Sequence, residues 1–249
     1  FITREGNDTV NGGGSGADMD RIRYDRGGVS GINADLNAGT ITGTWNGNAF
    51  TDTSSDIEWV RGNDNADTFT GTANAERFQG RGGNDILTGG GGADELWGED
   101  GNDRIEVPDT AFKEIAGGSG LDVLAIVGTG KNLDFSGLEN ISGIEEADLG
   151  SNSNTATITE QNVIDASNES NTDIDTALGA NAIPDAILVN GDNTDTLRLA
   201  DSGEIAGGSW ALDAVDSATF TGYDVYEYSA GGPALAQVAV DEVVPVTIV

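Results

Sequence analysis

Large hydrophobic residues recur every nine positions between residues 62 and 106. The stretch divides into five contiguous units, and the eighth place of each unit is apolar: Phe69, Phe78, Leu87, Leu96 and Ile105. Because side chains alternate between the two faces of a strand, the eighth residue points inward when places seven to nine are extended. Two units then form one coil with a strand on each side. Stacked coils form two parallel sheets, so the pattern predicts an all-β, parallel β-roll (a β-helix or solenoid).

The first six places of each unit predict a turn between strands. Every unit opens with glycine, and its fourth place is glycine or asparagine. Glycine adopts positive φ without a Cβ clash, and asparagine tolerates that conformation better than most residues. We therefore expect left-handed backbone where asparagine takes the fourth place, at Asn65 and Asn74. The chain has 38 glycines, about twice the average usage, in agreement with many tight turns.

The patterns predict three domains. Residues 1–61 read as degenerate repeats interrupted between 24 and 52 by a β-meander insert. Residues 62–125 form the β-roll. Residues 126–249 lack steady repeats and alternate short β runs with polar turns, which predicts a β-rich C-terminal cap or second β domain with a weak helical pattern at 161–182. Since the chain opens partway into a repeat, we interpret it as a piece of a longer protein.

Three acids outside the five units also fit the nine-residue frame. Asp8 is sixth in TREGNDTVN, and Asp18 closes GSGAD. Because their neighbouring coils are incomplete, a cation site and a metal-free turn are equally good interpretations. Asp195 is sixth in NGDNTDTLR. No partner turn lies one coil away from it, so we expect a hairpin turn there.

Charge and composition exclude several classes of function. The chain carries 43 acidic and 11 basic residues, a net charge of −32. Nucleic acid is therefore a poor partner, since phosphate binding needs clustered lysine and arginine. Cysteine and histidine are absent, which excludes disulfides, thiolate nucleophiles, Ser-His-Asp triads and the usual zinc sites. The sequence contains no apolar run of the roughly 18 residues that a membrane span requires.

Two further residue classes give weak signals. The tryptophans Trp45, Trp59, Trp97 and Trp210 are scattered along the chain, which favours packing over carbohydrate stacking. No pair of acids stands in a motif typical of glycoside hydrolysis, and we expect the chain not to be an enzyme.

The acids of the five units recur at a fixed place. The sixth places are Asp67, Glu76, Asp85, Asp94 and Asp103. Ca²⁺ binds about six to eight oxygens from carboxylates and backbone carbonyls, and a glycine-rich turn exposes its carbonyls. Turns on one edge of the roll lie about 4.8 Å apart, so a cation can lie between them. Without metal the stacked acids repel one another, and we expect the empty repeats to be disordered, so that binding energy is folding energy.

Two units match the nonapeptide GGxGxDxUx, where U is a large apolar residue, at every fixed place: GGGGADELW at 89–97 and GGSGLDVLA at 117–125. The pattern resembles the RTX (repeats-in-toxin), or hemolysin-type, calcium-binding repeat. The resemblance implies a β-roll that binds several Ca²⁺ ions, at least three here. It also implies a secreted bacterial protein, extracellular or on the cell surface, that the type I secretion machinery exports unfolded and that folds on Ca²⁺ outside the cell.

In that family, places two, four and six of one turn face places one, three and six of the turn one coil later, mostly through carbonyls. The sites that this implies are Asn63, Asn65 and Asp67 with Gly80, Gly82 and Asp85; Arg81, Gly83 and Asp85 with Gly98, Asp100 and Asp103; and Thr72, Asn74 and Glu76 with Gly89, Gly91 and Asp94. Asp85 is shared by the first two sites. We therefore expect that its loss damages two sites and that the loss of Asp67 damages one.

Two more sites are implied under conditions. One joins Glu99, Gly101 and Asp103 to Gly117, Ser119 and Asp122, provided that the extra residue before Gly117 is absorbed as a bulge. The other joins Gly90, Gly92 and Asp94 to the unit 107–115, which has Phe112 where an acid is needed. We expect that site to be weak or absent unless Asp109 substitutes.

Three functions fit these observations. The first is a calcium-binding structural module, such as an adhesin or a surface-matrix component, that contacts an extracellular surface. The second is the C-terminal repeat and export domain of a secreted enzyme (a protease, lipase or epimerase) whose catalytic domain lies elsewhere. The third is a self-assembling filament or surface-layer subunit that binds copies of itself through open sheet ends.

Overall fold

The computed structural model describes the chain except for residues 3–5, 15–18, 137, 139, 152, 160–161, 164–185, 201, 203–204, 214–222, 233 and 242. The chain divides into two compact units. The first comprises Phe1–Val107 with Ala111–Asp122, and the second comprises Pro108–Thr110 with Val123–Val249. The finer division at residues 61 and 125 stays a prediction.

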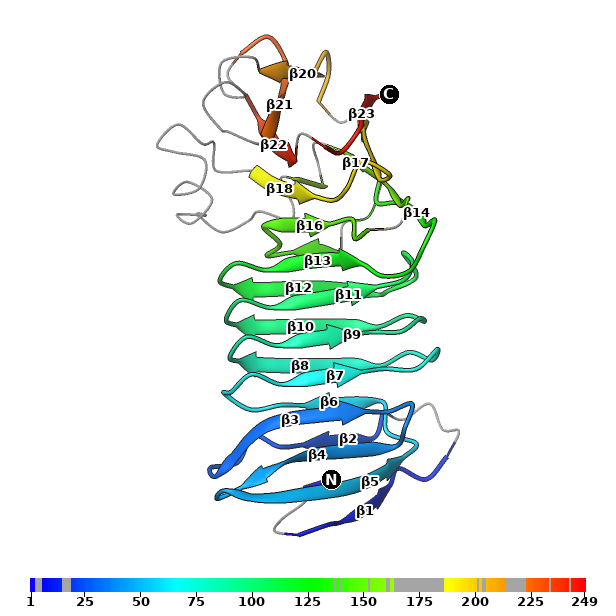
Figure 1. The fold of residues 1–249 in the computed structure, drawn as a ribbon, viewed down its shortest axis with the longest axis vertical. Coiled ribbons are helices and arrows are strands. Elements are labelled where there is room, and N and C mark those ends of the chain that lie inside the picture. The colour runs from blue at the N-terminus through cyan, green and yellow to red at the C-terminus, as the bar shows by residue number, and fades with distance from the viewer. Residues whose placement is uncertain are drawn as a thin grey trace. The chain divides into compact units, whose positions relative to one another are not determined.

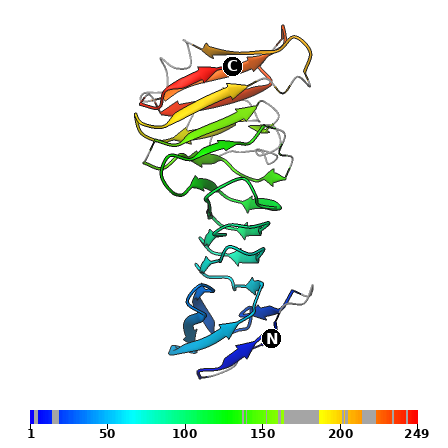
Figure 2. The same ribbon diagram turned by 90° about the vertical axis from the view of Figure 1, so that its right-hand side faces the viewer.

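The repeats of the first unit form two stacks of parallel strands (Figure 1). One stack has the order β12-β10-β8-β6-β2, and the other has the order β3-β7-β9-β11. In the perpendicular view, the cyan and green coils of this unit lie one above another (Figure 2). The strands are β2 (Arg21–Arg23), β6 (Trp59–Arg61), β8 (Arg77–Gly82), β10 (Glu95–Asp100), β12 (Glu114–Ser119), β3 (Val29–Asp35), β7 (Thr68–Thr70), β9 (Ile86–Thr88) and β11 (Arg104–Val107).

The eighth-place residues form the interior of these coils, as the hydrophobic period predicts. All five have an exposed fraction of 0%. In the strand register, Phe78 pairs with Leu96 and Phe69 pairs with Leu87. The eighth-place residues of successive coils therefore stack on one another. The rings of Phe69 and Phe78 meet with centroids 5.5 Å apart. Full burial of one such side chain stabilises the fold by about 1.5–3 kcal/mol. The prediction of an all-β, parallel β-roll is confirmed.

The segment before the repeats extends one sheet by an antiparallel meander. The strands β3, β4 (Thr40–Trp45) and β5 (Asn48–Ser55) pair in sequence order. At the outer edge, β5 pairs in parallel with β1 (Thr9–Asn11). The inner edge, β3, pairs in parallel with the first repeat strand, β7. The meander therefore covers an edge of the roll that would otherwise expose unpaired backbone groups.

The second unit is also built mainly from parallel strands, with an antiparallel pair beside β22. One set has the order β13-β16-β18-β22-β21-β20, and the other has the order β14-β17-β19-β23. The strands are β13 (Val123–Ile126), β14 (Asn132–Asp134), β15 (Ile141–Ser142), β16 (Glu146–Asp148), β17 (Thr155–Thr159), β18 (Ala186–Asn190), β19 (Thr196–Ala200), β20 (Ser209–Asp213), β21 (Tyr223–Ser229), β22 (Ala236–Asp241) and β23 (Val246–Ile248). Of the predicted helical stretch 161–182, residues 162–163 are helical, and the rest lies outside the described residues.

The hairpin expected around Asp195 is wrong. The strands on either side of it, β18 and β19, lie in different sheets, and each pairs in parallel with other strands. The turn at 191–195 therefore connects the two sheets, as the turns of the repeats do. The sequence interpretation failed because the coil before this turn is longer than two nonapeptides. The partner of Asp195 is therefore Asn154, 41 residues earlier.

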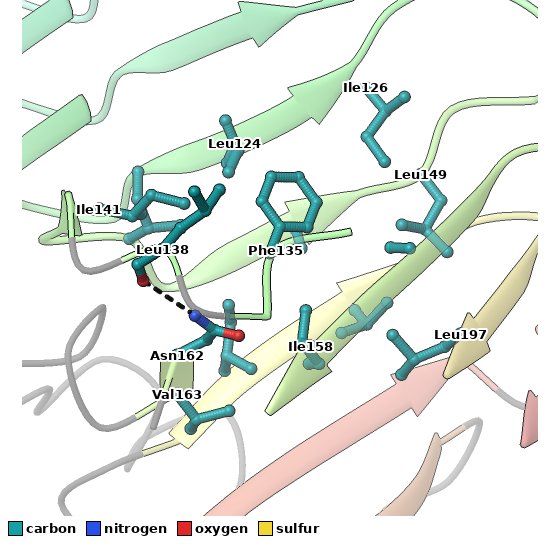
Figure 3. A pocket seen from close by; sticks show the side chains of 15 residues that line it. Leu124, Ile126, Phe135, Leu138, Ile141, Leu149, Ile158, Asn162, Val163 and Leu197 are labelled. Carbon is teal, nitrogen blue, oxygen red and sulfur yellow. Dashed lines mark hydrogen bonds between the residues drawn. The ribbon is translucent and has the colours of Figure 1, made fainter. Parts of the chain in front are cut away.

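The interior of the second unit is apolar (Figure 3). Leu124, Phe135, Ile158 and Leu197 face a cavity of about 40 Å³ between the two sheets. Ligand pockets are typically about 300–1,000 Å³. This space is therefore part of the hydrophobic core.

Candidate calcium sites

The sixth-place acids form a ladder of hydrogen bonds along the coils. Each carboxylate places one oxygen on the backbone N–H of the sixth residue one coil earlier. The donor and acceptor pairs are Asp67 N–H to Asp85 Oδ1 at 2.7 Å, Asp85 N–H to Asp103 Oδ1 at 2.8 Å, Asp103 N–H to Asp122 Oδ1 at 2.7 Å and Glu76 N–H to Asp94 Oδ1 at 2.8 Å. The turns 62–67, 80–85, 98–103 and 117–122 therefore share one edge, here called the first edge. The turns 71–76 and 89–94 share the second edge.

The other oxygen of each acid lies over the glycine that opens its own turn. A Cβ built on Gly80 would lie 2.0 Å from Asp85 Oδ2 and 2.8 Å from the carbonyl oxygen of Gly98. On Gly98 it would lie 2.1 Å from Asp103 Oδ2 and 2.5 Å from the carbonyl oxygen of Gly117. The first-place glycine is thus required because two oxygens converge where a side chain would begin.

Carbonyl oxygens from both turns lie in the gap between neighbouring turns of one edge. From the earlier turn, the fourth-place oxygen of Gly83 lies 1.8 Å from the Cβ position of Gly101, and the second-place oxygen of Glu99 lies 1.9 Å from that of Gly118. From the later turn, the first-place oxygen of Gly117 lies against Gly98. This is the division of places that the resemblance implies. The individual calcium ligands stay predictions.

The backbone of the glycine-rich turns explains why these carbonyls face the gap. The second and fourth places both have positive φ: 89° at Arg81 and 105° at Gly83, and 78° at Glu99 and 133° at Gly101. The left-handed region of ordinary residues centres near φ about +57°, so the fourth-place values belong to glycine. Arg81 directs its guanidinium to Asp64, at 3.2 Å, and leaves its own carbonyl to the turn.

On the first edge, the carboxylate oxygens Asp85 Oδ2 and Asp103 Oδ2 are buried and have no hydrogen-bond partner among the described residues. The two aspartates are each 1% exposed. An unsatisfied buried charge is costly. A hard divalent cation would satisfy it, and the surrounding carbonyls supply the oxygens that Ca²⁺ prefers. The gap between turns 80–85 and 98–103, and the gap between 98–103 and 117–122, therefore fit Ca²⁺.

Backbone carbonyls are necessary for such sites. Within the described parts of the chain, no group of three or more His, Cys, Asp or Glu side chains is arranged to hold a metal. Each gap instead combines two carboxylates with turn carbonyls. A cation bound there would neutralise the acids and join two successive turns.

The pKa values of these aspartates show the cost of burying them without metal. Burial raises the pKa of Asp85 to about 8, against a backbone hydrogen bond from Asp67 that lowers it, and the charges of Asp103, Asp67 and Glu99 raise it further. Burial likewise raises the pKa of Asp103 to about 6 and that of Asp67 to about 6. Burial in the metal-free fold therefore stabilises the protonated form of each acid relative to the unfolded chain.

This arrangement predicts opposite pH trends for the metal-free and the calcium-bound protein. A carboxyl whose pKa is raised on folding stabilises the fold below its unfolded pKa, and that stability is lost as pH rises through the folded pKa. For Asp85 the window runs from about pH 4 to about pH 8. Calcium needs the deprotonated form, so its apparent affinity should rise by up to about tenfold per pH unit across the upper part of this window.

The measurement is a set of thermal melts in chelator, with parallel calcium titrations, at about pH 5.5, about pH 7 and about pH 8.5. The variant Asp85→Asn is the control, because it keeps the oxygen that accepts the Asp67 N–H and cannot titrate. Equal pH trends in the wild type and the control would contradict the assignment to Asp85.

The turn 62–67 differs from the glycine-rich turns. The φ angles of Asn63 and Asn65 lie outside the positive region, so the left-handed conformation expected at Asn65 is wrong, and the same holds for Asn74 in the turn 71–76. The backbone N–H of Asn63 donates to Asp67 Oδ2 at 2.8 Å. An asparagine cannot adopt the φ of more than 100° that glycine takes at the fourth place, and the turn rearranges. In both predicted sites that use these turns, a backbone N–H of the turn therefore already bonds to the acid: that of Asn63 to Asp67, and that of Thr72 to Glu76.

The second edge ends at a basic residue. In the strand register Glu114 pairs with Glu95, so the unit after Glu106 has ten residues and Lys113 stands in the sixth place. The expectation that Phe112 takes this place is wrong, because the extra residue is absorbed between 107 and 113 and not directly before Gly117. Phe112 is buried, and the ammonium of Lys113 bonds with Glu95. In the candidate site of Gly90, Gly92 and Asp94, the sixth place opposite Asp94 is therefore a lysine and not an acid.

The insertion does not disturb the pairing of the sixth-place acids Asp103 and Asp122 on the first edge. Asp103 donates its amide to Asp122 Oδ1, and the hydroxyl of Ser119 donates to Asp100 Oδ1 at 2.9 Å. The conditional site of Glu99, Gly101 and Asp103 with Gly117, Ser119 and Asp122 is therefore brought together, without a bulge in strand β12.

Three sixth-place acids were missed from the sequence, and strand pairing identifies them. Asp8 donates its amide to Asp52 Oδ1 at 2.9 Å, and Asp20 donates its amide to Glu58 Oε2 at 3.0 Å. Glu58 could have been found, since TSSDIEWVR extends the frame one unit before residue 62. Asp52 could not, since it follows the meander. Asp20, not Asp18, precedes strand β2, and Asp18 lies outside the described residues.

The acid at Asp195 also stands in such a ladder, within the second unit. Its Oδ1 accepts the Asn154 N–H at 2.7 Å, and its Oδ2 accepts the Asp192 N–H at 2.9 Å. Asn154 in turn accepts the Lys131 N–H at 2.8 Å. This column combines one acid with an amide and a lysine, so it lacks the charge of a calcium site.

Two tryptophans that looked scattered in the sequence share one sheet face. The guanidinium of Arg77 lies 4.8 Å from the ring centre of Trp59 and 5.1 Å from that of Trp97. Arg21 also stacks on Trp59, at 4.6 Å. Cation–π contacts of this kind contribute about 0.5–1 kcal/mol each at exposed sites. Arginines already contact Trp59 from two neighbouring strands, which favours the packing role.

A comparison with known families agrees with this geometry. Residues 70–105 match the model of the RTX calcium-binding nonapeptide repeat, in 4 copies. No curated protein matches the chain. In the described residues, we find no helical segment with the length and hydrophobicity that crossing a bilayer requires. The matched residues contain turns of both edges, with the buried acids Asp85, Asp94 and Asp103 at their sixth places. Through residues 70–105, the chain carries repeats similar to the RTX calcium-binding nonapeptide repeat.

Proposed function

We propose that the chain is a structural module of a secreted bacterial protein, whose repeat coils fold when they bind calcium outside the cell. The observation that carries this proposal is the pair of buried, unpartnered oxygens, Asp85 Oδ2 and Asp103 Oδ2, over a row of turn carbonyls. Calcium binding itself follows from the RTX repeats. Secretion, the extracellular location and folding on calcium are the proposed part.

Coupling between folding and calcium has a physical basis in the inner coils. Each coil contributes few apolar side chains to the interior, and its turns are rich in glycine, which loses much conformational entropy on folding. The acids of successive turns also repel when they are charged. A bound cation would reverse that repulsion. Free calcium is scarce inside cells and abundant outside them, which suits export of an unfolded chain.

A structural or adhesive role is proposed over catalysis. The chain has neither histidine nor cysteine, which are the commonest general bases and thiol nucleophiles. The net charge of −32 would also let calcium join the acidic surface to another acidic surface, as in a surface matrix. We therefore propose that the partner is an extracellular surface and that the chain has no enzymatic activity of its own.

Calcium titration of the full chain tests this proposal. We expect saturable binding of more than one ion by calorimetry, together with a gain of β signal in circular dichroism that follows the same curve. Magnesium is the matched control, since it demands a smaller octahedral site and dehydrates reluctantly. A chain that binds no calcium, or binds magnesium equally well, would contradict the proposed function.

A further inference from the structure

We propose that the calcium dependence of the first unit begins at Gly80, and that the turns before it are held by the protein's own hydrogen-bond donors. The inference rests on the proposed function, because it presupposes calcium sites in the glycine-rich turns. It narrows those sites to the gaps that begin at turn 80–85 and turn 98–103. It also makes the N-terminal part of the unit a metal-independent platform on which the calcium-dependent coils assemble.

The first line of evidence is the saturation of the acids before Gly80. Asp67 Oδ1 accepts the Ile32 N–H at 2.7 Å, and its Oδ2 accepts the Asn63 N–H at 2.8 Å. Glu76 accepts both the amide of Thr72, at 3.1 Å, and the hydroxyl of Thr72. Both acids are 2% exposed, so these bonds replace the hydrogen bonds that water would donate to an exposed carboxylate.

The acid in the meander is saturated in the same way. Asp52 is fully buried, and its Oδ1 accepts the Asp8 N–H at 2.9 Å. Its Oδ2 accepts the hydroxyl of Tyr24 at 2.8 Å. The tyrosine ring stacks on Phe50 with centroids 5.8 Å apart, which fixes the hydroxyl in place. A side chain thus satisfies the oxygen that in turns 80–85 and 98–103 has no partner.

The second line of evidence is the residue at the fourth place. Where it is glycine, φ is 105° at Gly83 and 133° at Gly101, and the amide of the second residue makes no bond to the acid. Where it is asparagine, at Asn65 and Asn74, φ is not positive, and the second-place amide turns to the acid of its own turn. The fourth residue therefore determines whether an amide or a cation satisfies the carboxylate.

Hydrogen exchange of the full chain in excess chelator, read at single amides by NMR, tests the platform. We expect the amides of Asn63 and Thr72 to stay protected, and those of Asp85 and Asp103 to exchange at least about 100-fold faster than with calcium, because they lie in coils that open without metal. Uniform exchange across both groups in chelator would overturn the inference, and so would uniform protection. The variant Tyr24→Phe should reduce the remaining protection in chelator.

A gain of binding tests the role of the fourth place. The double variant Asn65→Gly with Asn74→Gly should bind at least one more calcium ion than the wild type in calorimetry. Ala66→Gly with Ala75→Gly is the control, since it adds equal backbone freedom at the fifth place of the same two turns and should bind the wild-type number. An unchanged number in the double variant would contradict the inference while leaving the proposed function intact. A wild type that binds no calcium would instead overturn the proposed function itself.

Discussion

The variant Asp103→Asn should lose two calcium ions, the largest loss from any single substitution of a carboxylate in the repeats. Asp103 Oδ2 lies in the gap toward turn 117–122, and its Oδ1 lies in the gap toward turn 80–85, where it accepts the Asp85 N–H. Asparagine keeps the acceptor and removes the charge. If each site is occupied about 100-fold above its dissociation constant, each lost ion costs about 2.7 kcal/mol. The sum is a large share of the roughly 5–15 kcal/mol that stabilises a domain.

Two other variants make this prediction specific. Asp85→Asn removes one carboxylate from one gap and should lose one ion. Asp67→Asn should keep the wild-type number, because Asn63 and Ile32 already donate to its oxygens. The measurements are calcium stoichiometry by calorimetry and calcium-dependent melting by circular dichroism. Equal losses of calcium in all three variants would contradict the assignment. They would show that binding depends on the total charge of the stacked acids and not on the two gaps that we identify.

The order of these effects revises the expectation from spacing alone. Spacing makes Asp85 the acid shared by two sites. In our proposal, the hydrogen bonds to Asp67 in turn 62–67 take the place of a cation in one of those sites, and the shared position becomes Asp103. Spacing counts acids at equal intervals, and it cannot show that a backbone amide already occupies one of them.

The variant Gly98→Ala should destabilise the calcium-bound fold by about 3 kcal/mol or more, the upper part of the usual range for overpacking. Its φ is not in the positive region, so the backbone conformation suits alanine and the effect is steric. The new Cβ would lie 2.1 Å from Asp103 Oδ2 and 2.5 Å from the Gly117 carbonyl oxygen. Both oxygens would have to move out of the gap.

Gly91→Ala is the matched control. Gly91 stands in the glycine-rich turn of the repeat 89–97, and a Cβ built on it meets nothing within 4 Å. Chemical unfolding at saturating calcium should therefore separate the two alanine variants by several kcal/mol, with Gly91→Ala close to the wild type. A Gly98→Ala protein that melts like Gly91→Ala would mean that the first-place glycine is not required by the gap.

The repeats were predictable because their information is local. A nine-residue period determines which residue faces inward, which residue opens the turn and where the acid stands. Phe69, Phe78, Leu87, Leu96 and Ile105 are buried as that period predicts. The match to the nonapeptide also identified calcium as the metal. Each of these conclusions needs only the spacing within and between units.

The partners of residues far apart in the chain were not predictable in this way. Asp52 pairs with Asp8 across the meander, and Asp195 accepts from Asn154 across a longer coil. Lys113 enters the sixth place because an extra residue is absorbed before it and not after it. In each case the spacing is not a multiple of nine, and only strand register determines which residues meet.

By itself, therefore, the sequence determined the β-roll, its inward residues and the kind of cation that its turns suit. The tertiary structure decided which acids of the turns are satisfied by the protein's own donors. Asn63 and Asp67 in one turn, and Glu99 and Asp103 in another, have the same spacing. In the first the second-place amide bonds to the acid, and in the second the positive φ of Glu99 leaves the acid open. The physical reason is that burial makes every acid require a partner, and the backbone conformation of its own turn determines whether the protein supplies one.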